Sequence, residues 1–178
     1  MEDTLPFDIE GFDTDNGSEF LNYRLWRYFR ERPVPVEFTR SRPYHKNDNA
    51  HVEQKQWTHV RQLLGYQRLE HRRLVALIND LYSHEWRALQ NFFLPSMRLI
   101  SKSREGGHWR RRHSAPRTPY ERLLDSAKVS QEAKDELRQQ FQSFDPFALS
   151  QSVQSKLRAI LRPARKAEKR IKNTRVAA

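Results

Sequence analysis

Two acidic residues stand where a phosphoryl-transfer site could use them. Asp15 ends a short apolar stretch and is followed at once by Asn16 and Gly17. Glu53 lies 38 positions further on, at the start of an amphipathic segment. Carboxylates from separate elements can hold two Mg²⁺ ions about 3.5–4 Å apart, on either side of the phosphate under attack. Asp15 and Glu53 are therefore candidates for such a site.

Each carboxylate also has an ordinary structural interpretation. The Asp15 side chain could close a turn, and Glu53 could offset a helix dipole. A calcium loop of the EF-hand type is excluded by register, because the position five residues before Gly17 is Phe12 and not Asp. Asp13 shares the face of Asp15 if the strand continues, but two carboxylates on one strand cannot reproduce a ligand from a neighbouring strand.

These segments resemble the catalytic core of the DDE transposases and retroviral-type integrases, in which an Asp-Asn-Gly strand end precedes a Glu on a helix. The likeness continues through residues 38–45 (Phe-Thr-Arg-Ser-Arg-Pro-Tyr-His), 91–95 and 118–123. The resemblance implies a ribonuclease H-like core and metal-dependent cleavage of a DNA end followed by strand transfer. It also implies that Asp15 and Glu53 are catalytic residues and bind Mg²⁺ or Mn²⁺.

The same resemblance assigns DNA contacts around Glu53. Tyr44 and Asn49 fall where related integrases place loop residues that meet the DNA end. Gln56 lies on the helical face of Glu53, and Arg61 sits two turns on, within reach of a phosphate beside the metals. We therefore expect these four residues to bind DNA.

The family's remaining carboxylate, the first Asp in its sequence, belongs to a strand far ahead of the Asp-Asn-Gly strand. Only 14 residues precede Asp15, so we expect that ligand to lie outside this chain and the chain alone to be inactive. The alternative function is that of a non-catalytic remnant that binds DNA or a protein partner. Besides DNA, the candidate partners are a second copy of the chain and an upstream-encoded N-terminal half.

The charge of the chain is large and uneven. The net charge is +11, yet residues 1–20 hold seven acidic side chains and no Lys or Arg. Residues 21–178 therefore carry 33 basic against 15 acidic side chains. This asymmetry favours a nucleic acid as partner, because phosphate neutralisation and counterion release supply most non-specific affinity. A solvated basic surface without a ligand is the alternative.

Two runs concentrate the basic charge. Arg110, Arg111 and Arg112 are consecutive, and residues 156–175 hold nine Lys or Arg against one Glu. Such residues suit contact with the DNA backbone. Trp109, beside the first run, could stack on a base or cover the core. An RNA-binding protein is a weaker interpretation, since nothing resembles a stacking motif on a four-stranded sheet.

Several classes are excluded by composition. The chain has no cysteine, which excludes a disulfide-stabilised fold and a Cys/His zinc module. No apolar run approaches the ~20 residues of a membrane span, and the acidic N-terminal segment has the wrong charge for a signal peptide. We expect no membrane association and a cytoplasmic, nucleoid-associated location.

The fold class is therefore predicted as α/β: the C-terminal part of a ribonuclease H-like integrase core, a small basic β element and a helical tail. We expect residues 1–95 to be the partial core, 96–125 the β element with a short helix, and 126–178 the charged helical tail. In the first part we expect two parallel strands over 5–13 and 34–38, a helix over 20–32 capped by Ser18, a loop over 40–48 and helices over 49–64 and 68–95. In the second part we expect a strand from Met97, a turn at Gly106 and Gly107, a helix begun by Thr118 and Pro119, and helices over 130–143 and 146–173.

Overall fold

The computed structural model describes residues 5–14, 22–42, 45–67 and 69–176 of a mixed α/β chain. The chain divides into two compact units, Met1–Gln67 and Arg68–Ala178. This division falls earlier than the boundary we expected at residue 95. The reason is that the helices of residues 73–88 pack against the long C-terminal helix α8, Pro146–Val176. Each unit is described by itself.

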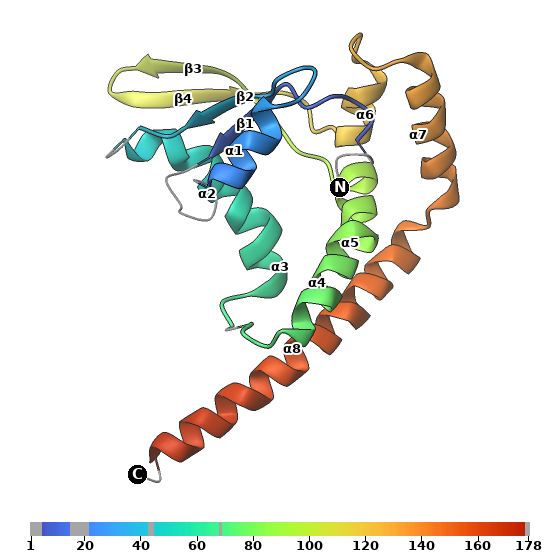
Figure 1. Ribbon diagram of the computed structural model, residues 1–178. Coiled ribbons are helices and arrows are strands. Elements are labelled where there is room, and N and C mark those ends of the chain that lie inside the picture. Colours follow the sequence, from blue (N-terminus) through green and yellow to red (C-terminus); the bar gives the residue numbers. More distant parts are fainter. Residues whose placement is uncertain (1–4, 15–21, 43–44, 68, 177–178) are drawn as a thin grey trace. The chain divides into compact units, whose positions relative to one another are not determined.

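The first unit contains a small sheet and the helices around it (Figure 1). Its elements are β1 (Gly11–Thr14), α1 (Tyr23–Arg30), β2 (Glu37–Arg40), the 3₁₀ turn η2 (Lys46–Asn49), α2 (Ala50–Gln56), the π-helical turn η3 (Trp57–Arg61) and α3 (Gln62–Leu64).

The two strands of this sheet run parallel, as expected, in a register that runs from Gly11 opposite Glu37 to Thr14 opposite Arg40. Both strands start later than the sequence suggested. At the second strand the cause is Pro35, which has no N–H to donate to a ladder. The next residue, Val36, donates its N–H to the Phe29 carbonyl at 3.0 Å instead, so pairing with β1 begins only at Glu37.

Three phenylalanines form the core between α1 and the sheet. The ring of Phe12 stacks on those of Phe29 and Phe38, with centroids 4.6 and 5.7 Å apart. Helix α1 begins at Tyr23, and its cap is Asn22, whose side-chain oxygen accepts the Leu25 N–H at 2.8 Å. The prediction that Ser18 caps this helix is therefore wrong: the helix begins later than expected.

The second unit is mainly helical (Figure 1). Its elements are α4 (Arg73–Ser83), α5 (Glu85–Ala88), the π-helical turn η4 (Leu89–Phe93), β3 (Leu99–Glu105), β4 (His108–His113), α6 (Pro119–Leu124), α7 (Gln131–Ser143) and α8 (Pro146–Val176). The two charged helices expected over 130–143 and 146–173 are confirmed, as is the basic hairpin.

The core of this unit has two parts. Where α8 lies along α4 and α5 (Figure 1), Leu81 and Ile160 are fully buried and Leu74 and Val153 nearly so. Around the π turn, aromatic rings from three elements pack together, with Phe92 against Tyr120 and Phe144 at 5.2 Å. The rings of Tyr120 and Phe141 stack with an interplanar angle of 10°. Residues 89–93 thus join α6 and α7 to the long helices.

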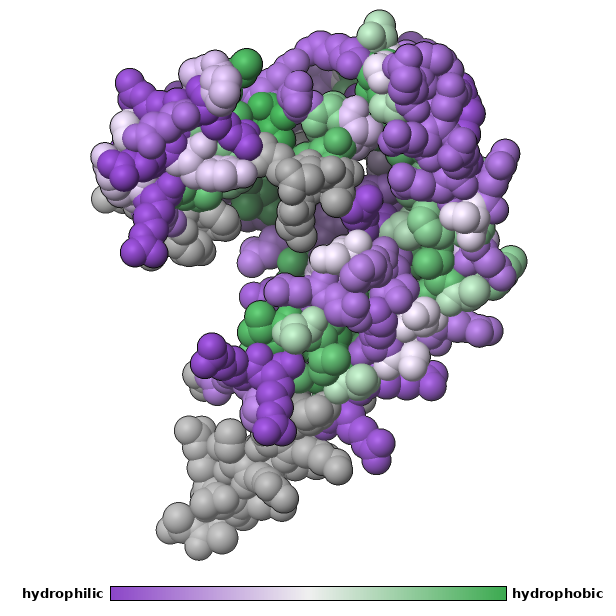
Figure 2. Space-filling view, turned by 45° about the vertical axis from the view of Figure 1, so that its right-hand side comes forward, coloured by the Kyte–Doolittle hydropathy of each residue, from purple (hydrophilic) through white to green (hydrophobic). Residues whose placement is uncertain are grey.

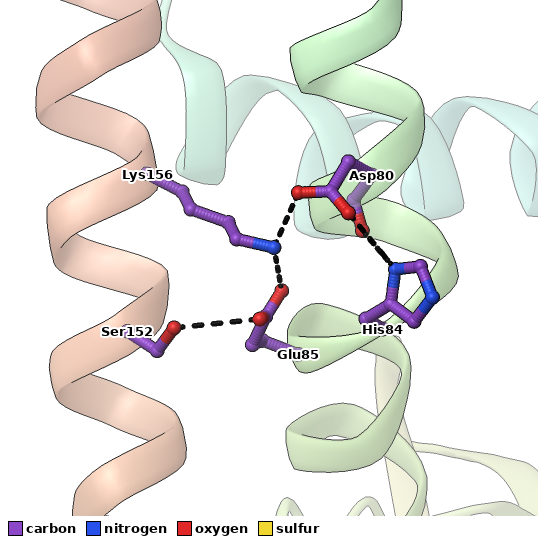
Figure 3. Close-up of polar contacts among 5 residues, drawn as sticks. All are labelled: Asp80, His84, Glu85, Ser152 and Lys156. Atoms are coloured by element: carbon purple, nitrogen blue, oxygen red, sulfur yellow. Dashed lines mark hydrogen bonds and ion pairs between the residues drawn. The ribbon is translucent and has the colours of Figure 1, made fainter.

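One ion-pair network fixes α8 against α4 and α5 (Figure 3). The Lys156 ammonium bonds both to the Asp80 carboxylate and to the Glu85 carboxylate, the latter at 2.6 Å. Residues five apart on a continuous α-helix are about 140° apart around its axis, so they could not both face one ammonium. The single helix expected over 68–95 is in fact broken at His84, whose backbone is non-helical (φ −117°, ψ −91°). The break brings both carboxylates to Lys156.

Strands β3 and β4 form a two-stranded antiparallel ribbon. Gly106 and Gly107 make its turn with positive φ angles of 54° and 89°, which favour glycine and match the twist of a tight hairpin. At the base of the ribbon the backbones of Ser96 and Arg117 pair through two hydrogen bonds of 2.9 and 3.1 Å. The Arg122 guanidinium of α6 donates to the Ser96 hydroxyl at 2.9 Å, so a helix holds the base.

On the face shown in Figure 2 the described residues are mostly hydrophilic, with smaller apolar areas between them. Helix α8 has 31 residues, which is long enough to cross a bilayer. Its sequence is too polar for that, and no helix among the described residues combines the length and apolarity of a membrane span.

Candidate functional site

The backbone just before Asp15 is firmly held. Thr14 is buried, and its carbonyl accepts both the N–H of Ser41 at 2.9 Å and the Ser41 hydroxyl at 3.3 Å. The carboxyl ends of β1 and β2 are thereby tied together at one edge of the sheet. Asp15 itself, the first of the two predicted metal ligands, lies outside the described residues.

Asp13 has a structural partner. Its carboxylate accepts a hydrogen bond of 2.9 Å from the hydroxyl of Thr39, the residue opposite it on β2. Because side chains alternate along a strand, this pair lies on the other face of the sheet from Phe12 and Phe38. Asp13 therefore stabilises strand pairing.

A bidentate ion pair folds the loop between β2 and α2. The Arg42 guanidinium donates to both Asp48 carboxylate oxygens, at 2.8 and 3.1 Å. The Arg42 N–H adds a third bond at 3.3 Å. These bonds to Arg42 lower the pKa of Asp48 to about 2. The loop that carries Tyr44, a predicted DNA contact that lies outside the described residues, is thus closed by its own ends.

The helix that follows presents the second predicted ligand. Glu53 is exposed in the first turn of α2, and within the described residues its carboxylate has no hydrogen-bond or ion-pair partner. Gln56, the last residue of α2, is exposed as well. Both side chains are accessible to a ligand.

Two polar atoms near this site have no hydrogen-bond partner among the described residues. They are the Thr14 hydroxyl oxygen, one residue before Asp15, and the side-chain oxygen of Asn49, four residues before Glu53. Asn49 occupies the N-cap position of α2 without capping it. Unsatisfied buried polar atoms are uncommon and often mark functional positions.

Arg61 lies in a π-helical turn that follows α2. A π turn holds an extra residue, which rotates all later residues by about 100° relative to a continuous α-helix. The Gln62 N–H bonds to the Trp57 carbonyl, five residues back, in this way. Arg61 is the last residue of this turn, and its expected contact with a phosphate stays a prediction. The Arg61 guanidinium lies over the ring of Tyr66, 5.0 Å from its centroid.

A metal centre does not arise from the described residues alone. Among them no group of three or more His, Cys, Asp or Glu side chains converges to hold an ion. His59 is partly buried, and burial, with the nearby charge of Lys55, lowers its pKa. Of the two predicted ligands of Mg²⁺ or Mn²⁺, only Glu53 is placed by the structure.

The arginine run splits between the two faces of the ribbon. Strand pairing places Ser101 opposite Arg112 and Ser103 opposite Arg110. We call this side the serine face, with Ser101, Ser103, Glu105, His108, Arg110 and Arg112. The other side, the Trp109 face, carries Lys102, Arg104, Trp109 and Arg111. Every one of these side chains is exposed.

The serine face is hollowed. A shallow concavity along the ribbon is lined by Ser101, Ser103, Glu105, Arg110, Arg111 and Arg112. Glu105 stands at its end and pairs with Arg110 at 3.4 Å. Exposed pairs of this kind contribute less than about 1 kcal/mol, so a phosphate can replace the carboxylate. Two guanidinium groups and two hydroxyls on one face suit a phosphate backbone.

Sequence reasoning found the arginines of the ribbon but not their partition, which depends on strand register. It also missed the pairing of Arg42 with Asp48, whose only signal was opposite charge at either end of a short loop.

Comparisons with known proteins add one relative. No family model matches the chain, and no solved structure matches it. Over 118 residues the chain is 41% identical to the uncharacterized protein y4rM of Sinorhizobium fredii. The aligned segment covers 66% of this chain and 33% of that protein. The chain therefore spans about one third of the length of the curated relative that it matches.

Proposed function

We propose that this chain is part of a DDE-type integrase or transposase with a ribonuclease H-like core, and that its partner is DNA. The observation that carries the proposal is the parallel pairing of β1 and β2 immediately before Asp15. The carboxyl ends of parallel strands share one edge of a sheet, where sites of α/β proteins gather. Asp15 follows that edge directly, and Glu53 follows it on the first helix after β2.

Metal chemistry enters this proposal only through the resemblance. Mg²⁺ or Mn²⁺, held by Asp15, Glu53 and a further carboxylate, would polarise the phosphate and activate the attacking hydroxyl. The described residues do not form that ligand set, so we assign no reaction step to them. What they offer is a free carboxylate at Glu53 and cationic surfaces for DNA. The nucleoid location is part of the same proposal.

The catalytic proposal is tested by DNA end joining in Mg²⁺ and in Mn²⁺. The proteins to compare are this chain alone and this chain joined to the N-terminal segment of a complete transposase. We expect turnover only from the joined protein, and its loss in Glu53→Gln. Glu37→Gln, a control on β2 that removes an equally exposed carboxylate, should keep activity. Joining by the Glu53 variant at the normal rate would overturn the assignment.

A second function, DNA binding without catalysis, is favoured by the ribbon. Five cations and one carboxylate stand exposed on residues 99–113. A two-stranded ribbon also has the width that the major groove of a duplex admits. Both functions require that the chain bind duplex DNA, and only the first requires Glu53. The end-joining experiment therefore separates them.

Duplex binding is tested by its salt dependence. The logarithm of the binding constant falls linearly with the logarithm of the salt concentration, and each lost phosphate contact makes this slope shallower by about 0.9. Replacing Arg110 and Arg112 by Gln should therefore reduce the slope for a blunt duplex by about 2. Lys128→Gln with Arg138→Gln, two exposed charges outside the ribbon, should leave it unchanged. Equal effects of the two double variants would show that net charge alone, and not the serine face, binds the duplex.

A further inference from the structure

Trp109 lies in an unusual environment for its type. Its indole is 55% exposed, although tryptophan is normally among the more buried residues. It stands on a ribbon whose side chains are exposed on both faces. The interpretation that it covers a core, which the sequence left open, does not fit this exposure. An exposed indole is free to contact a ligand.

The charges around the indole select the ligand. Arg104 is paired directly opposite Trp109, and Lys102 is paired with Arg111 two positions along. These three cations share the indole's face, whereas the one carboxylate of the ribbon, Glu105, lies on the serine face. An aromatic plane among three cations, without a carboxylate on that face of the ribbon, suits an anionic ligand that has flat rings.

One of these cations, Lys102, lies over the ring of Trp109. The Lys102 ammonium lies 4.3 Å from the ring centroid. At an exposed site this contact contributes about 0.5–1 kcal/mol. A nucleobase stacked on an aromatic side chain contributes about 1–3 kcal/mol. A base can therefore displace the ammonium, which then lies beside the phosphates of the same strand.

We propose that the Trp109 face binds unpaired nucleotides of a DNA strand, with a base stacked on Trp109 and the phosphates contacted by Lys102, Arg104 and Arg111. This inference rests on the proposed DNA partner and adds a substrate class to it. In the interior of a duplex both flat sides of each base are covered by its neighbours, so there Trp109 could reach only base edges. An unpaired or frayed end exposes the flat side that an indole recognises.

The two faces of the ribbon then bind different parts of the DNA. The serine face offers guanidinium and hydroxyl groups, which contact a backbone without regard to base pairing. The Trp109 face adds stacking, which requires an unpaired base. A junction between duplex and single strand offers a paired backbone to the serine face and an unpaired base to the Trp109 face at the same time.

The test uses the full chain and three fluorescein-labelled DNAs of matched sequence: a blunt duplex, the same duplex with an unpaired extension of five nucleotides, and the single strand alone. Affinities are measured by anisotropy at several salt concentrations for the wild type, Trp109→Ala, Trp109→Phe and Phe147→Ala. Phe147 is the control, because it is an exposed aromatic residue of the same unit on α8, 80% exposed.

We expect Trp109→Ala to weaken binding of the single strand and the extended duplex about tenfold, and binding of the blunt duplex less than twofold. Trp109→Phe should keep most of the affinity, and Phe147→Ala all of it. Since stacking releases no counterions, the salt slope of Trp109→Ala should equal that of the wild type.

Two results would overturn the inference. One is an equal loss for all three DNAs, which would make Trp109 a structural residue of the ribbon. The other is an unchanged affinity of Trp109→Ala for unpaired DNA. A chain that binds single-stranded RNA of the same sequence tenfold more tightly than DNA would overturn the choice of ligand. If no DNA binds even at low salt, the proposed function itself fails, a result distinct from these.

Discussion

Single polar side chains determine where several elements of this chain begin. Thr118 caps α6: its hydroxyl oxygen accepts the Glu121 N–H at 3.1 Å, and the Glu121 carboxylate accepts the Thr118 N–H at 2.7 Å. The backbone bond from Thr118 lowers the pKa of Glu121. This reciprocal arrangement satisfies two N–H groups that a helix start would leave open. It also sets the direction of the chain as it leaves the ribbon.

Replacing Thr118 by Ala should lower the free energy of unfolding of the second unit by about 1 kcal/mol, the usual contribution of an N-cap side chain. Thermal unfolding followed by circular dichroism checks this. Thr118→Ser, which keeps the hydroxyl, is the matched control and should unfold close to the wild type. Equal losses in both variants would indicate that packing of the methyl group matters more than the cap.

The Arg42–Asp48 pair should govern how readily the loop before α2 opens. In Asp48→Asn, tryptic cleavage after Lys46 should be several-fold faster at pH 7, because the bidentate bond is lost. Glu31→Gln, which removes an exposed ion pair with Arg27 on α1, should not change it. A cleavage rate equal to that of the wild type would show that the loop is held by other contacts.

The pH dependence of this pair has a definite sign. The folded pKa of Asp48, about 2, lies below the ordinary value of about 3.9. Its stabilisation is therefore fully present above about pH 4 and is lost as the pH falls toward 2. Amide exchange of residues 42–49 should accelerate, relative to the intrinsic rate, over that window in the wild type. Asp48→Asn should show no such change.

Helix packing in the second unit includes one half-buried lysine, Lys156, which bonds to carboxylates of α4 and α5. Burial disfavours the charged form of Lys156, but the hydrogen bonds that its ammonium donates to Asp80 and Glu85 outweigh it and raise the pKa of the ammonium. The bond to Lys156 in turn lowers the pKa of Asp80. The network is therefore complete between the ordinary pKa values of the two groups, about 3.9 and about 10.4, and weakens outside that range.

Lys156→Gln should lower the stability of the second unit by about 1–2 kcal/mol near pH 7, less than for a fully buried pair because solvent reaches both carboxylates. Urea unfolding at pH 7 and pH 3 checks this. The difference in the free energy of unfolding between pH 7 and pH 3 should be smaller in the variant, because Lys156 no longer stabilises the ionised carboxylates. Arg158→Gln, at an exposed position two residues further along α8, should retain the wild-type pH dependence.

Elements with strong local signals were predicted closely from the sequence. The turn at Gly106 and Gly107, the Thr118 cap and the two C-terminal helices needed only neighbouring residues. The two π turns and the break at His84 were not predicted. The turn at Leu89–Phe93 contacts α6 and α8, and the break at His84 serves the bonds to Lys156, so both involve residues distant in the sequence. The register of the ribbon, which decides the faces of Arg110 to Arg112, was likewise not contained in either strand alone.

The candidate site was predicted in part. Glu53 was expected on an accessible helix start, and that is where it lies. The partners of Asp13 and Arg42 were not foreseen, since hydrogen bonds of single side chains leave no periodic signal. Asp15 and Tyr44 lie outside the described residues, so their assignment remains a prediction.

The two units should differ when separated. The second contains its own core around Leu81 and Ile160, so residues 68–178 should fold alone with a cooperative thermal transition. The first has a two-stranded sheet, which is marginal by itself, and a core of few side chains around Phe29. Residues 1–67 alone should therefore unfold without a clear transition. Calorimetry of both fragments beside the full chain checks this; a cooperative transition in 1–67 would contradict it.

The π turns at Trp57–Arg61 and Leu89–Phe93 have a consequence for natural variation. Each holds one residue more than an α-helical turn needs. A deletion of one residue there would rewind the turn to α without shortening a loop or breaking either flanking helix. It would, however, rotate everything beyond it by about 100°. In an alignment of this chain with a relative, a gap of one residue at either turn would thus indicate a change from π to α winding. The side chains after the turn would then face in a different direction.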